Sequence, residues 1–380
     1  MRIPMVFMRG GTSKAAFFHE ADLPHDPVLR DKFFLAAFGS PDAYGRQIDG
    51  IGGAVSSTSK VAVIGDGKEF GVDVTYEFGQ VSIDKPLVDR RSNCGNISSA
   101  VGPFAVDEGL VTPTEPITLV RILNTNTQKV IVAHVPTKDG RFDPIGDFHL
   151  PGIPVPASPV QLDFLNPGGA VTGRLLPTGN PVDDLLVPDL GTIAVSVVDA
   201  ANPAVFVRWE DLGLSGLESP AVVSEDRELL ARLEAIRAHA SVLAGIADTI
   251  EDATYFVPSV PKIALVGTPR DYMTSVGEKI RGVETGLRAS IMSMGRMHNS
   301  YPLTGAIATT VAAHIPGTLV HEVAVLNQGE LALGHPSGVL TMAADVSHEP
   351  SGWTVNSVTD TRSARRLMEG HLLVPDERLG

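Results

Sequence analysis

Glycine and proline interrupt this chain so often that short β-strands are the elements it favours. The 380 residues include 38 Gly and 28 Pro, and most apolar runs between them are short and rich in Val and Ile, which is typical of strands. The expected strands are residues 61–66, 71–83, 117–124, 129–135, 191–199, 262–267, 322–328 and 338–346. The chain is therefore expected to be built mainly from strands.

Helices are expected at three places. Residues 225–246 carry Leu and Ile at helical spacing behind an acidic first turn, which predicts a helix. Two shorter apolar helices are expected at 97–106 and 306–313, each after a glycine-containing turn. The octapeptides CGNISSAV (94–101) and TGAIATTV (304–311) share Gly, Ile and Val in register. This match indicates an internal duplication, although eight small residues can also agree by chance.

The length predicts two lobes, because single cores stop growing at about 250–300 residues. A turn-rich segment near 178–184 marks the boundary, so the first lobe is expected to cover 1–184 and the second 185–349. The tail 350–380 is expected to complete the first lobe, with 365–375 forming a helix and a strand. The fold class is therefore α/β with two similar lobes. The active site is expected in the cleft between them, where two helix N-termini attract carboxylates.

The charge balance limits the partners. Lys and Arg total 30 against 44 Asp and Glu, which gives a net charge of −14 and argues against nucleic acid and anionic membranes as partners. No apolar stretch approaches the roughly 18 residues of a membrane span, and the N-terminal apolar run is too short for a signal peptide. A cytoplasmic protein with a locally basic site is expected, and its oligomeric state stays open between a monomer and a homo-oligomer.

Cys94 is the only cysteine. It lies in the polar turn SNCGN directly before the helix expected at 97–106, and a helix N-terminus favours the thiolate. Cys94 is therefore a candidate acid, base or nucleophile, although a buried inert thiol is the commoner fate of a free cysteine. A proton transfer between two facing thiols is excluded, because the duplicated position holds Thr304.

Lys60 is the best candidate for the second acid–base group. It stands between the glycine-rich and serine-rich loop before it and the apolar strand 61–66, and partial burial there would lower its pKa. The alternative is a solvated lysine at the end of a strand.

The segment RGGTSK (9–14) is a candidate carboxylate site. Gly10 and Gly11 let backbone N–H groups approach an anion, while Arg9, Thr12 and Ser13 offer further donors. Its spacing does not match a nucleotide-binding loop, and the patterns of NAD, zinc and calcium sites are missing. No cofactor and no metal is therefore assigned.

The region before Thr304 holds one further candidate site. His298 is flanked by Arg296 and by Asn299, which together offer donors for a carboxylate. A polar surface loop is the alternative for each of these residues.

Five motifs together resemble a known family. They are RGGTSK (9–14), RQIDGIGGAVSSTSK (46–60), GQVSIDKPLVDRRSNCGNISSAVGPFA (79–105), ILNTNT (122–127) and GHPSG (334–338). The chain resembles, over nearly its whole length, the family of methylitaconate Δ-isomerase and 2-methylaconitate cis-trans isomerase, which includes oxalomesaconate tautomerases. This resemblance implies the diaminopimelate-epimerase-like fold, with two pseudo-symmetric lobes that each hold a central helix in a curved, mostly antiparallel sheet.

The resemblance also implies a function. Lys60 and Cys94 fall on positions that the family uses around its substrate. This implies an isomerase that needs no cofactor and catalyses an allylic 1,3-proton shift or a cis-trans isomerisation in a small unsaturated di- or tricarboxylate. Lys60 is the favoured base and Cys94 the favoured acid, and the exchanged assignment is the alternative. The alternatives are an oxalomesaconate tautomerase and, in another class, a non-catalytic carboxylate-binding protein. The expected substrate-binding residues are Arg9, Thr12, Ser13, Gln47, Ser57, Gly95, Asn96, Arg296, His298, Thr304 and Gly305.

Overall fold

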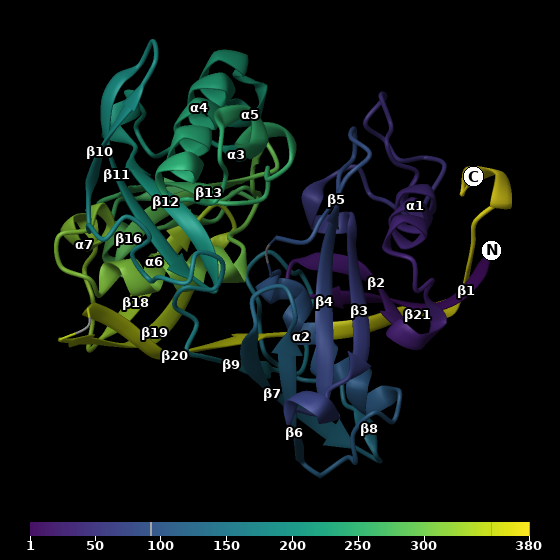
Figure 1. Ribbon diagram of the computed structural model, residues 1–380. Helices are drawn as coiled ribbons and strands as arrows, with labels where there is room; N and C mark the ends of the chain where they lie inside the picture. Colours follow the sequence, from purple (N-terminus) through teal and green to yellow (C-terminus); the bar gives the residue numbers. More distant parts are fainter. Residues whose placement is uncertain (92, 351, 380) are drawn as a thin grey trace. The chain divides into compact units, whose positions relative to one another are not determined.

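The computed structural model describes residues 1–91, 93–350 and 352–379; Ser92, in the SNCGN turn, therefore lies outside the described residues. The chain forms two compact units (Figure 1). Unit 1 consists of Met1–Asp163 and Thr361–Gly380, and unit 2 of Phe164–Asp360.

The boundaries read from the sequence, 184/185 and 349/350, are therefore corrected to 163/164 and 360/361. The first boundary moves because the segment after residue 163 bonds to the second unit. The Gly169 N–H donates to the Asp199 carbonyl at 2.8 Å, and the Val171 and Thr172 N–H groups donate to the Asp199 carboxylate at 2.9 and 2.7 Å.

Unit 1 is a sheet with an α-helix on each face. Its strands are β1 (Arg2–Gly10), β2 (Ser13–His19), β3 (Lys60–Asp66), β4 (Val74–Val81), β5 (Val88–Asp89), β6 (Ile117–Asn124), β7 (Lys129–Lys138), β8 (Arg141–Phe142), β9 (Val160–Leu165) and β21 (Ala364–Leu373). Its α-helices are α1 (Pro27–Phe38) and α2 (Gly95–Asp107). Strand alternation sends neighbouring side chains to opposite faces. Phe18 accordingly contacts Phe33 and Phe34 of α1, while Phe17 contacts Phe104 of α2.

Unit 2 has the same plan. Its strands are β10 (Asp183–Val187), β11 (Gly191–Ala200), β12 (Asn202–Arg208), β13 (Lys262–Gly267), β14 (Tyr272–Met273), β15 (Lys279–Ile280), β16 (Leu287–Ser293), β17 (Arg296–Met297), β18 (Glu330–His335), β19 (Gly338–Glu349) and β20 (Gly352–Arg362). Its α-helices are α3 (Pro220–Glu225), α4 (Arg227–Leu243), α5 (Ile250–Tyr255), α6 (Leu303–Ala313) and α7 (Leu319–Val323). Met292 packs in a core cluster with Leu233 of α4, while Ile291 faces Gly305 of α6.

The two units repeat one order of pairing. In unit 1 the successive pairs β1–β2, β2–β3, β3–β4, β4–β6 and β6–β7 are antiparallel, parallel, antiparallel, parallel and antiparallel. In unit 2 the pairs β11–β12, β12–β13, β13–β16, β16–β18 and β18–β19 follow the same sequence of directions. Each unit has one central helix, α2 in unit 1 and α6 in unit 2, at the same point of this order. Along the chain α2 lies between the parallel partners β4 and β6, and α6 lies between the parallel partners β16 and β18. This agreement supports the duplication inferred from the two octapeptides.

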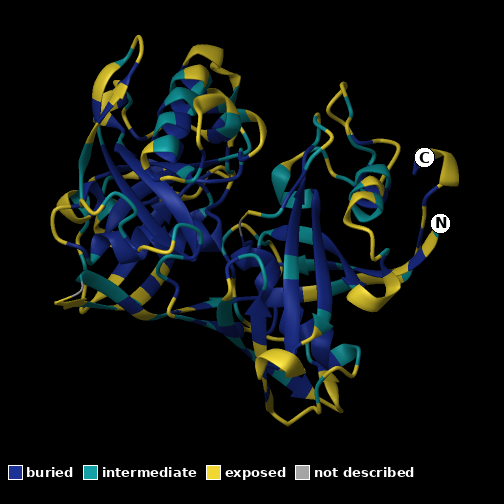
Figure 2. Ribbon diagram, in the orientation of Figure 1, coloured by how far each residue is buried: buried dark blue, intermediate teal, exposed yellow. Residues whose placement is uncertain are grey.

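Both central helices are buried along most of their length (Figure 2). Small residues make this possible. A Cβ at Gly102 of α2 would lie 2.6 Å from Val135 Cγ2, and one at Gly305 of α6 would lie 2.6 Å from Ile291 Cδ1.

The helices expected at 97–106 and 306–313 lie within α2 and α6, and the helix expected at 225–246 corresponds to α4, which begins after the N-cap Asp226 and ends at Leu243. Two other segments differ from expectation. Residues 365–375 return to the first unit as expected, yet they form β21 alone, antiparallel to β1, so the expected helix is wrong. Residues 322–328 were expected as a strand. The Thr318 side chain instead accepts from the His321 N–H and caps α7, so the strand begins later, as β18.

Candidate functional site

Lys60 is the first residue of β3 and its side chain is buried. The residue is 7% exposed, its ammonium donates to Gln80 Oε1 at 2.5 Å, and Nζ lies 5.1 Å from the centre of the Phe78 ring. Burial lowers the pKa of Lys60 from its ordinary value of 10.5, and the neighbouring Cys94 partly opposes that effect. A lysine in this environment loses its proton more readily than one in water, which suits a base.

Cys94 is the residue that begins α2 and lies beside Lys60. It is 9% exposed and occupies the N-cap position, where its carbonyl accepts from the Ser98 N–H at 2.9 Å. Its thiol is within hydrogen-bonding reach of the Lys60 side chain. The first N–H groups of a helix have no partner inside the helix and favour negative charge. Lys60 and Cys94 therefore lie buried together at a helix N-terminus within unit 1, and an amine beside a thiol has the chemistry to act as an acid–base pair.

The RGGTSK turn packs against the same end of α2. Asn96 donates through Nδ2 to Thr12 Oγ1 at 3.1 Å, and a Cβ on Gly11 would lie 2.3 Å from Asn96 Oδ1. Gly11 has a φ of +52°, and its N–H donates to the Ser363 carbonyl at 2.9 Å. The glycine here permits close packing on the helix, and its N–H is not the free anion donor that the sequence suggested.

Arg9 and Ser13 flank this turn. The Arg9 Nη1 donates to the carbonyls of Gly11 and Ser363, each at 2.9 Å, and no carboxylate pairs with Arg9 in the part of the chain that the structure describes. Burial and the like charge of Arg365 lower the pKa of Arg9. Ser13 is buried at the start of β2.

Gln47 and Ser57 lie in the loop before β3. The Gln47 side chain is buried and already occupied, because it donates to Ser40 at 2.9 Å and accepts from Ser59 at 2.6 Å and from the Ala54 N–H at 2.9 Å. Its position supports a structural role in shaping the loop. Ser57 is half-buried in a short 3₁₀ turn, Ser56–Thr58.

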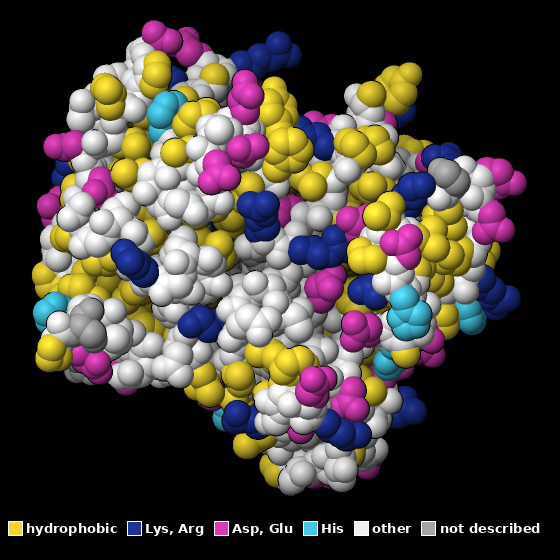
Figure 3. All heavy atoms as spheres, viewed as in Figure 1, with side chains coloured by type: hydrophobic (Ala, Val, Ile, Leu, Met, Phe, Trp, Pro, Cys, Tyr) yellow, Lys and Arg dark blue, Asp and Glu magenta, His cyan; other side chains and the backbone are white. Residues whose placement is uncertain are grey.

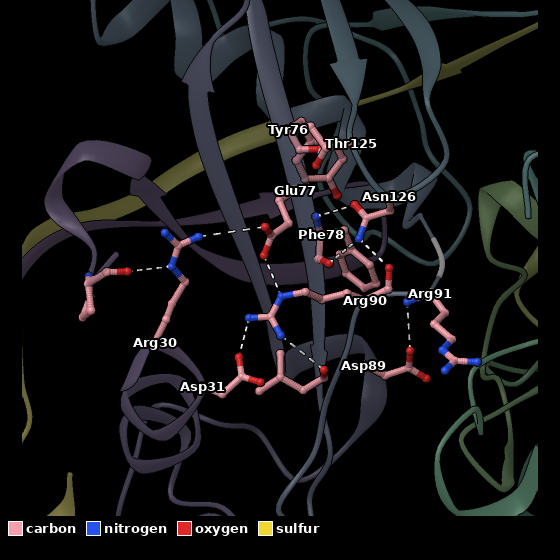
Figure 4. A network of polar contacts seen from close by, with 12 residues as sticks. Arg30, Asp31, Tyr76, Glu77, Phe78, Asp89, Arg90, Arg91, Thr125 and Asn126 are labelled. Atoms are coloured by element: carbon pink, nitrogen blue, oxygen red, sulfur yellow. Dashed lines mark hydrogen bonds and ion pairs between the residues drawn. The ribbon is translucent and has the colours of Figure 1, made fainter. Parts of the chain in front are cut away.

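The chain leading into Cys94 is held to β4 by Asn126 (Figure 4). Asn126 donates to the carbonyls of Phe78 at 2.8 Å and Arg90 at 2.7 Å, and it accepts from the Phe78 N–H at 2.7 Å. Arg90 in turn binds Glu77 of β4 at 2.6 Å and Asp31 of α1 at 2.5 Å. These contacts join the approach to Cys94 to the strand that carries Phe78 and Gln80.

The remaining predicted residues lie in unit 2. Arg296 is exposed in the β16–β17 hairpin, and His298 is half-buried and accepts from the Ser300 N–H at 3.0 Å through Nδ1. Thr304 and Gly305 are buried in the first turn of α6. Pro302 is the N-cap of α6, so Thr304 is the second residue of that helix, whereas Cys94 is the N-cap of α2.

Sequence reasoning did not select Gln80 or Asn126, although both lie in motifs that it quoted. Gln80 pairs with Lys60 across two antiparallel strands, and that register cannot be read from the sequence. The second Asn of ILNTNT is Asn126, and a repeated asparagine after an apolar strand was the available signal.

The surface agrees with an acidic protein. On the face shown in Figure 3, Lys and Arg side chains are scattered among acidic ones and gather in no single large basic patch. Within the described residues, no set of three or more His, Cys, Asp or Glu side chains is placed to hold a metal ion. No helix in residues 1–91, 93–350 and 352–379 is both long enough and apolar enough to cross a membrane.

Comparison with known proteins gives full-length matches. The profile of the family described as PrpF protein matches residues 1–375. The 3-methylitaconate isomerase of Eubacterium barkeri is 44% identical, over 100% of this chain and 99% of its own. The 2-methyl-aconitate isomerase of Shewanella oneidensis is 42% identical, over 99% and 97%. The 4-oxalomesaconate tautomerase of Pseudomonas putida is 38% identical, over 100% and 98%.

Solved structures agree on the fold. The crystal structure of a methylitaconate-delta-isomerase matches with a TM-score of 0.78 and 43% identity, covering 100% of this chain and 97% of the other. A hydroxyproline epimerase from Agrobacterium vitis matches with a TM-score of 0.58 at 13% identity, over 100% and 95%. The epimerase shares the fold alone. These likenesses confirm the two-lobed, epimerase-like fold expected from the sequence.

Proposed function

This chain belongs to the PrpF protein family, and we propose that it is an isomerase that moves a proton within a small unsaturated di- or tricarboxylate. The observation that carries the proposal is the buried pair of Lys60 and Cys94 at the N-terminus of α2. The isomerase class also fits the names of its full-length relatives.

The proposed reaction is a 1,3-proton shift. Neutral Lys60 takes a proton from the carbon vinylogous to a carboxylate, and the electron pair of the broken C–H bond spreads into a dienolate. Cys94 then gives a proton to the other end of the allyl system, so a new C–H bond forms and the double bond moves. A proton passes from the Lys60 ammonium to the Cys94 thiolate beside it, which restores both groups for the next turnover. In a cis-trans isomerisation, rotation about the former double bond precedes the return of the proton. General acid–base catalysis of this kind contributes roughly 10²- to 10⁴-fold.

The dienolate places negative charge on the carboxylate oxygens, and the site must stabilise that charge. The N-terminus of α2 supplies N–H groups at Gly95 and Asn96 and the positive end of the helix dipole. Arg9 adds a positive charge without a carboxylate partner among the described residues. Thr12 and Ser13 remain proposed substrate donors beside it.

The contribution of unit 2 remains a prediction. We expect Arg296, His298 and the first turn of α6, with Thr304 and Gly305, to contact the far end of the same substrate. The location of the active site between the two lobes and the cytoplasmic setting are likewise predictions.

The substrate is proposed to be of the 2-methylaconitate, 3-methylitaconate or aconitate type. The two relatives with 42% and 44% identity are named for methylaconitate and methylitaconate. Oxalomesaconate is the second candidate, because a relative that is 38% identical is named for it. Both readings use the same acid–base pair.

Proton NMR in deuterated buffer tests the proposal. Each candidate substrate is incubated with wild type, Lys60→Ala, Cys94→Ser and the control Lys68→Ala, whose side chain is 89% exposed. We expect isomerisation with deuterium entering the allylic carbons for wild type and the control, loss of both in Lys60→Ala, and weakening or loss in Cys94→Ser.

The same experiment assigns the two roles. If a variant still exchanges deuterium at only one allylic carbon, the replaced residue handles the proton at the other carbon. Full activity in Lys60→Ala would refute the proposed base. Binding of these acids to wild type without any isomerisation or exchange would leave a carboxylate-binding protein instead.

A further inference from the structure

Gln80 is the polar residue that directly contacts the Lys60 side chain from the neighbouring strand. It lies on β4, is 4% exposed and is the antiparallel partner of Lys60. Its Oε1 accepts from Lys60 Nζ at 2.5 Å. Its Nε2 donates to the Ser59 carbonyl at 2.9 Å and to the Ser56 carbonyl at 3.2 Å.

These partners fix which way the amide points. Backbone carbonyls can only accept, so the NH₂ group must face Ser56 and Ser59. The carbonyl oxygen of Gln80 must then face Lys60. An amide rotated by 180° would place Oε1 against the carbonyl oxygens of Ser56 and Ser59 and the NH₂ group against the Lys60 ammonium. Neither side could then form a hydrogen bond. The loop before β3 therefore holds Gln80 as a dedicated acceptor.

Lys60 has little freedom among its neighbours. The Phe78 ring lies 5.1 Å from Nζ, Gln80 accepts one N–H, and Cys94 is the titratable group whose charge and hydrogen bond act on Lys60. Tyr76, on the same strand face as Phe78 and Gln80, is buried and is kept protonated because burial raises its pKa well above the ordinary value. The strand face of β4 that carries Tyr76, Phe78 and Gln80 therefore holds no charged side chain that competes with Gln80 at the amine; Glu77 alternates to the other face, where it pairs with Arg90.

We propose that Gln80 is a positioning residue that aims the Lys60 amine at the substrate carbon. A neutral amine has two N–H bonds and one lone pair. Because the Gln80 oxygen can only accept, it binds an N–H and turns the lone pair away from β4, toward the side of Cys94. The same hydrogen bond supports the ammonium after Lys60 has taken the proton. This inference rests on the proposed function, in which Lys60 handles the proton.

The hydrogen bond has a consequence that packing alone does not have. An acceptor on the ammonium favours the charged form of a lysine, so changes at Gln80 should move the titration of Lys60 in a direction set by their charge. Gln80→Glu offers an anionic acceptor of the same shape. Gln80→Met keeps the approximate volume and offers no comparable acceptor.

The test measures that titration directly, by ¹³C NMR of the Lys60 Cε in protein labelled at lysine, with Lys60→Arg to assign the signal. We expect the pKa of Lys60 to rise by about one to three pH units in Gln80→Glu and to fall by about one pH unit in Gln80→Met. The control Gln128→Glu makes the same chemical change on an exposed side chain that donates to the Thr125 carbonyl, and it should leave Lys60 unchanged.

Kinetics provide the second readout. The acid limb of the kcat/KM profile should move to higher pH in Gln80→Glu and to lower pH in Gln80→Met, with kcat reduced more than KM is changed. Shifts in the same direction in both variants, or a loss of activity with an unmoved Lys60 titration, would show that Gln80 only packs the strand and would overturn the proposal. Opposite NMR shifts with no isomerisation by wild type would confirm that the Gln80 hydrogen bond sets the titration of Lys60 and would reject the proposed function.

Discussion

Replacing Lys60 by Met should change how the stability of the protein depends on pH. The Lys60 side chain is buried, and burial is the largest cause of its lowered pKa. The folded state therefore releases this proton more readily than the unfolded chain, in which the ordinary value of 10.5 applies. Met has a similar length and carries no charge, so it removes this one titration.

The sign follows from proton linkage. Between the lowered pKa of folded Lys60 and 10.5, the unfolded state binds more protons than the folded state, so wild-type stability rises with pH. The slope is about 1.4 kcal/mol per pH unit for one proton. Below that window the slope from Lys60 vanishes, and the full cost of the buried ammonium is present. Met removes this cost but leaves the Gln80 oxygen without its donor, at about 1–3 kcal/mol.

Urea unfolding of wild type and Lys60→Met from pH 6 to pH 10.5 measures the effect. The free energy of unfolding of wild type, minus that of the variant, should be flat at low pH and then rise toward pH 10.5. The exposed control Lys68→Met should give a difference that does not vary with pH. A flat difference for Lys60→Met over the whole range would refute the claim that burial shifts the pKa of Lys60.

Three further changes test the surroundings of the pair. Asn126→Ala removes the amide that joins Phe78 to Arg90, so urea unfolding should show a free energy of unfolding lower by about 1–3 kcal/mol. Its kcat should fall while KM changes little, and an unchanged kcat would show that Asn126 does not support catalysis. Gly11→Ala puts a Cβ 2.3 Å from Asn96 Oδ1 at a φ of +52°, so a melting temperature equal to that of wild type would contradict the close packing described. Cys94→Ser should lower kcat by roughly 10²- to 10⁴-fold with less than about 1 kcal/mol lost in stability, and wild-type kcat would remove Cys94 from the reaction.

The sequence predicted the parts of the fold that depend on local pattern. Pro or Gly stands directly before β6, β13 and β18, at Pro116, Pro261 and Gly329, and the two octapeptides placed both central helices. It mispredicted 322–328 and the start of 365–375, where a cap at Thr318 and pairing of β21 with β1 decide the structure. The boundary at 163/164 was also out of reach, because it depends on bonds from the following segment to Asp199.

In the site, too, the residues with a local sequence pattern were predicted and those that depend on long-range contacts were not. Lys60 and Cys94 were selected from their neighbours in the chain, and the structure brings the two together. Gln80 contacts Lys60 only through the register of β3 and β4, and Asn126 acts through contacts with Phe78 and Arg90, 48 and 36 residues away along the chain. Long-range contacts of this kind leave no local pattern in a single sequence.

Duplication of the fold has not duplicated the chemistry. Lys60 opens β3 and Lys262 opens β13, and each of these strands pairs in parallel with the strand before it in the sheet. Lys262 is half-buried and its ammonium donates to the Ser259 carbonyl at 3.4 Å. Lys60 is buried and its ammonium donates to the Gln80 side chain.

The two helix starts differ as well. Cys94 is the N-cap of α2, whereas Thr304 lies within the first turn of α6 behind Pro302. A hydroxyl at that position is a far weaker acid than a thiol. The proposed acid–base pair therefore lies in unit 1 alone. Such asymmetry fits a reaction in which a proton leaves one carbon and a proton is added to another carbon of the same substrate. It does not fit the inversion of configuration at one carbon by two matched thiols, one from each unit.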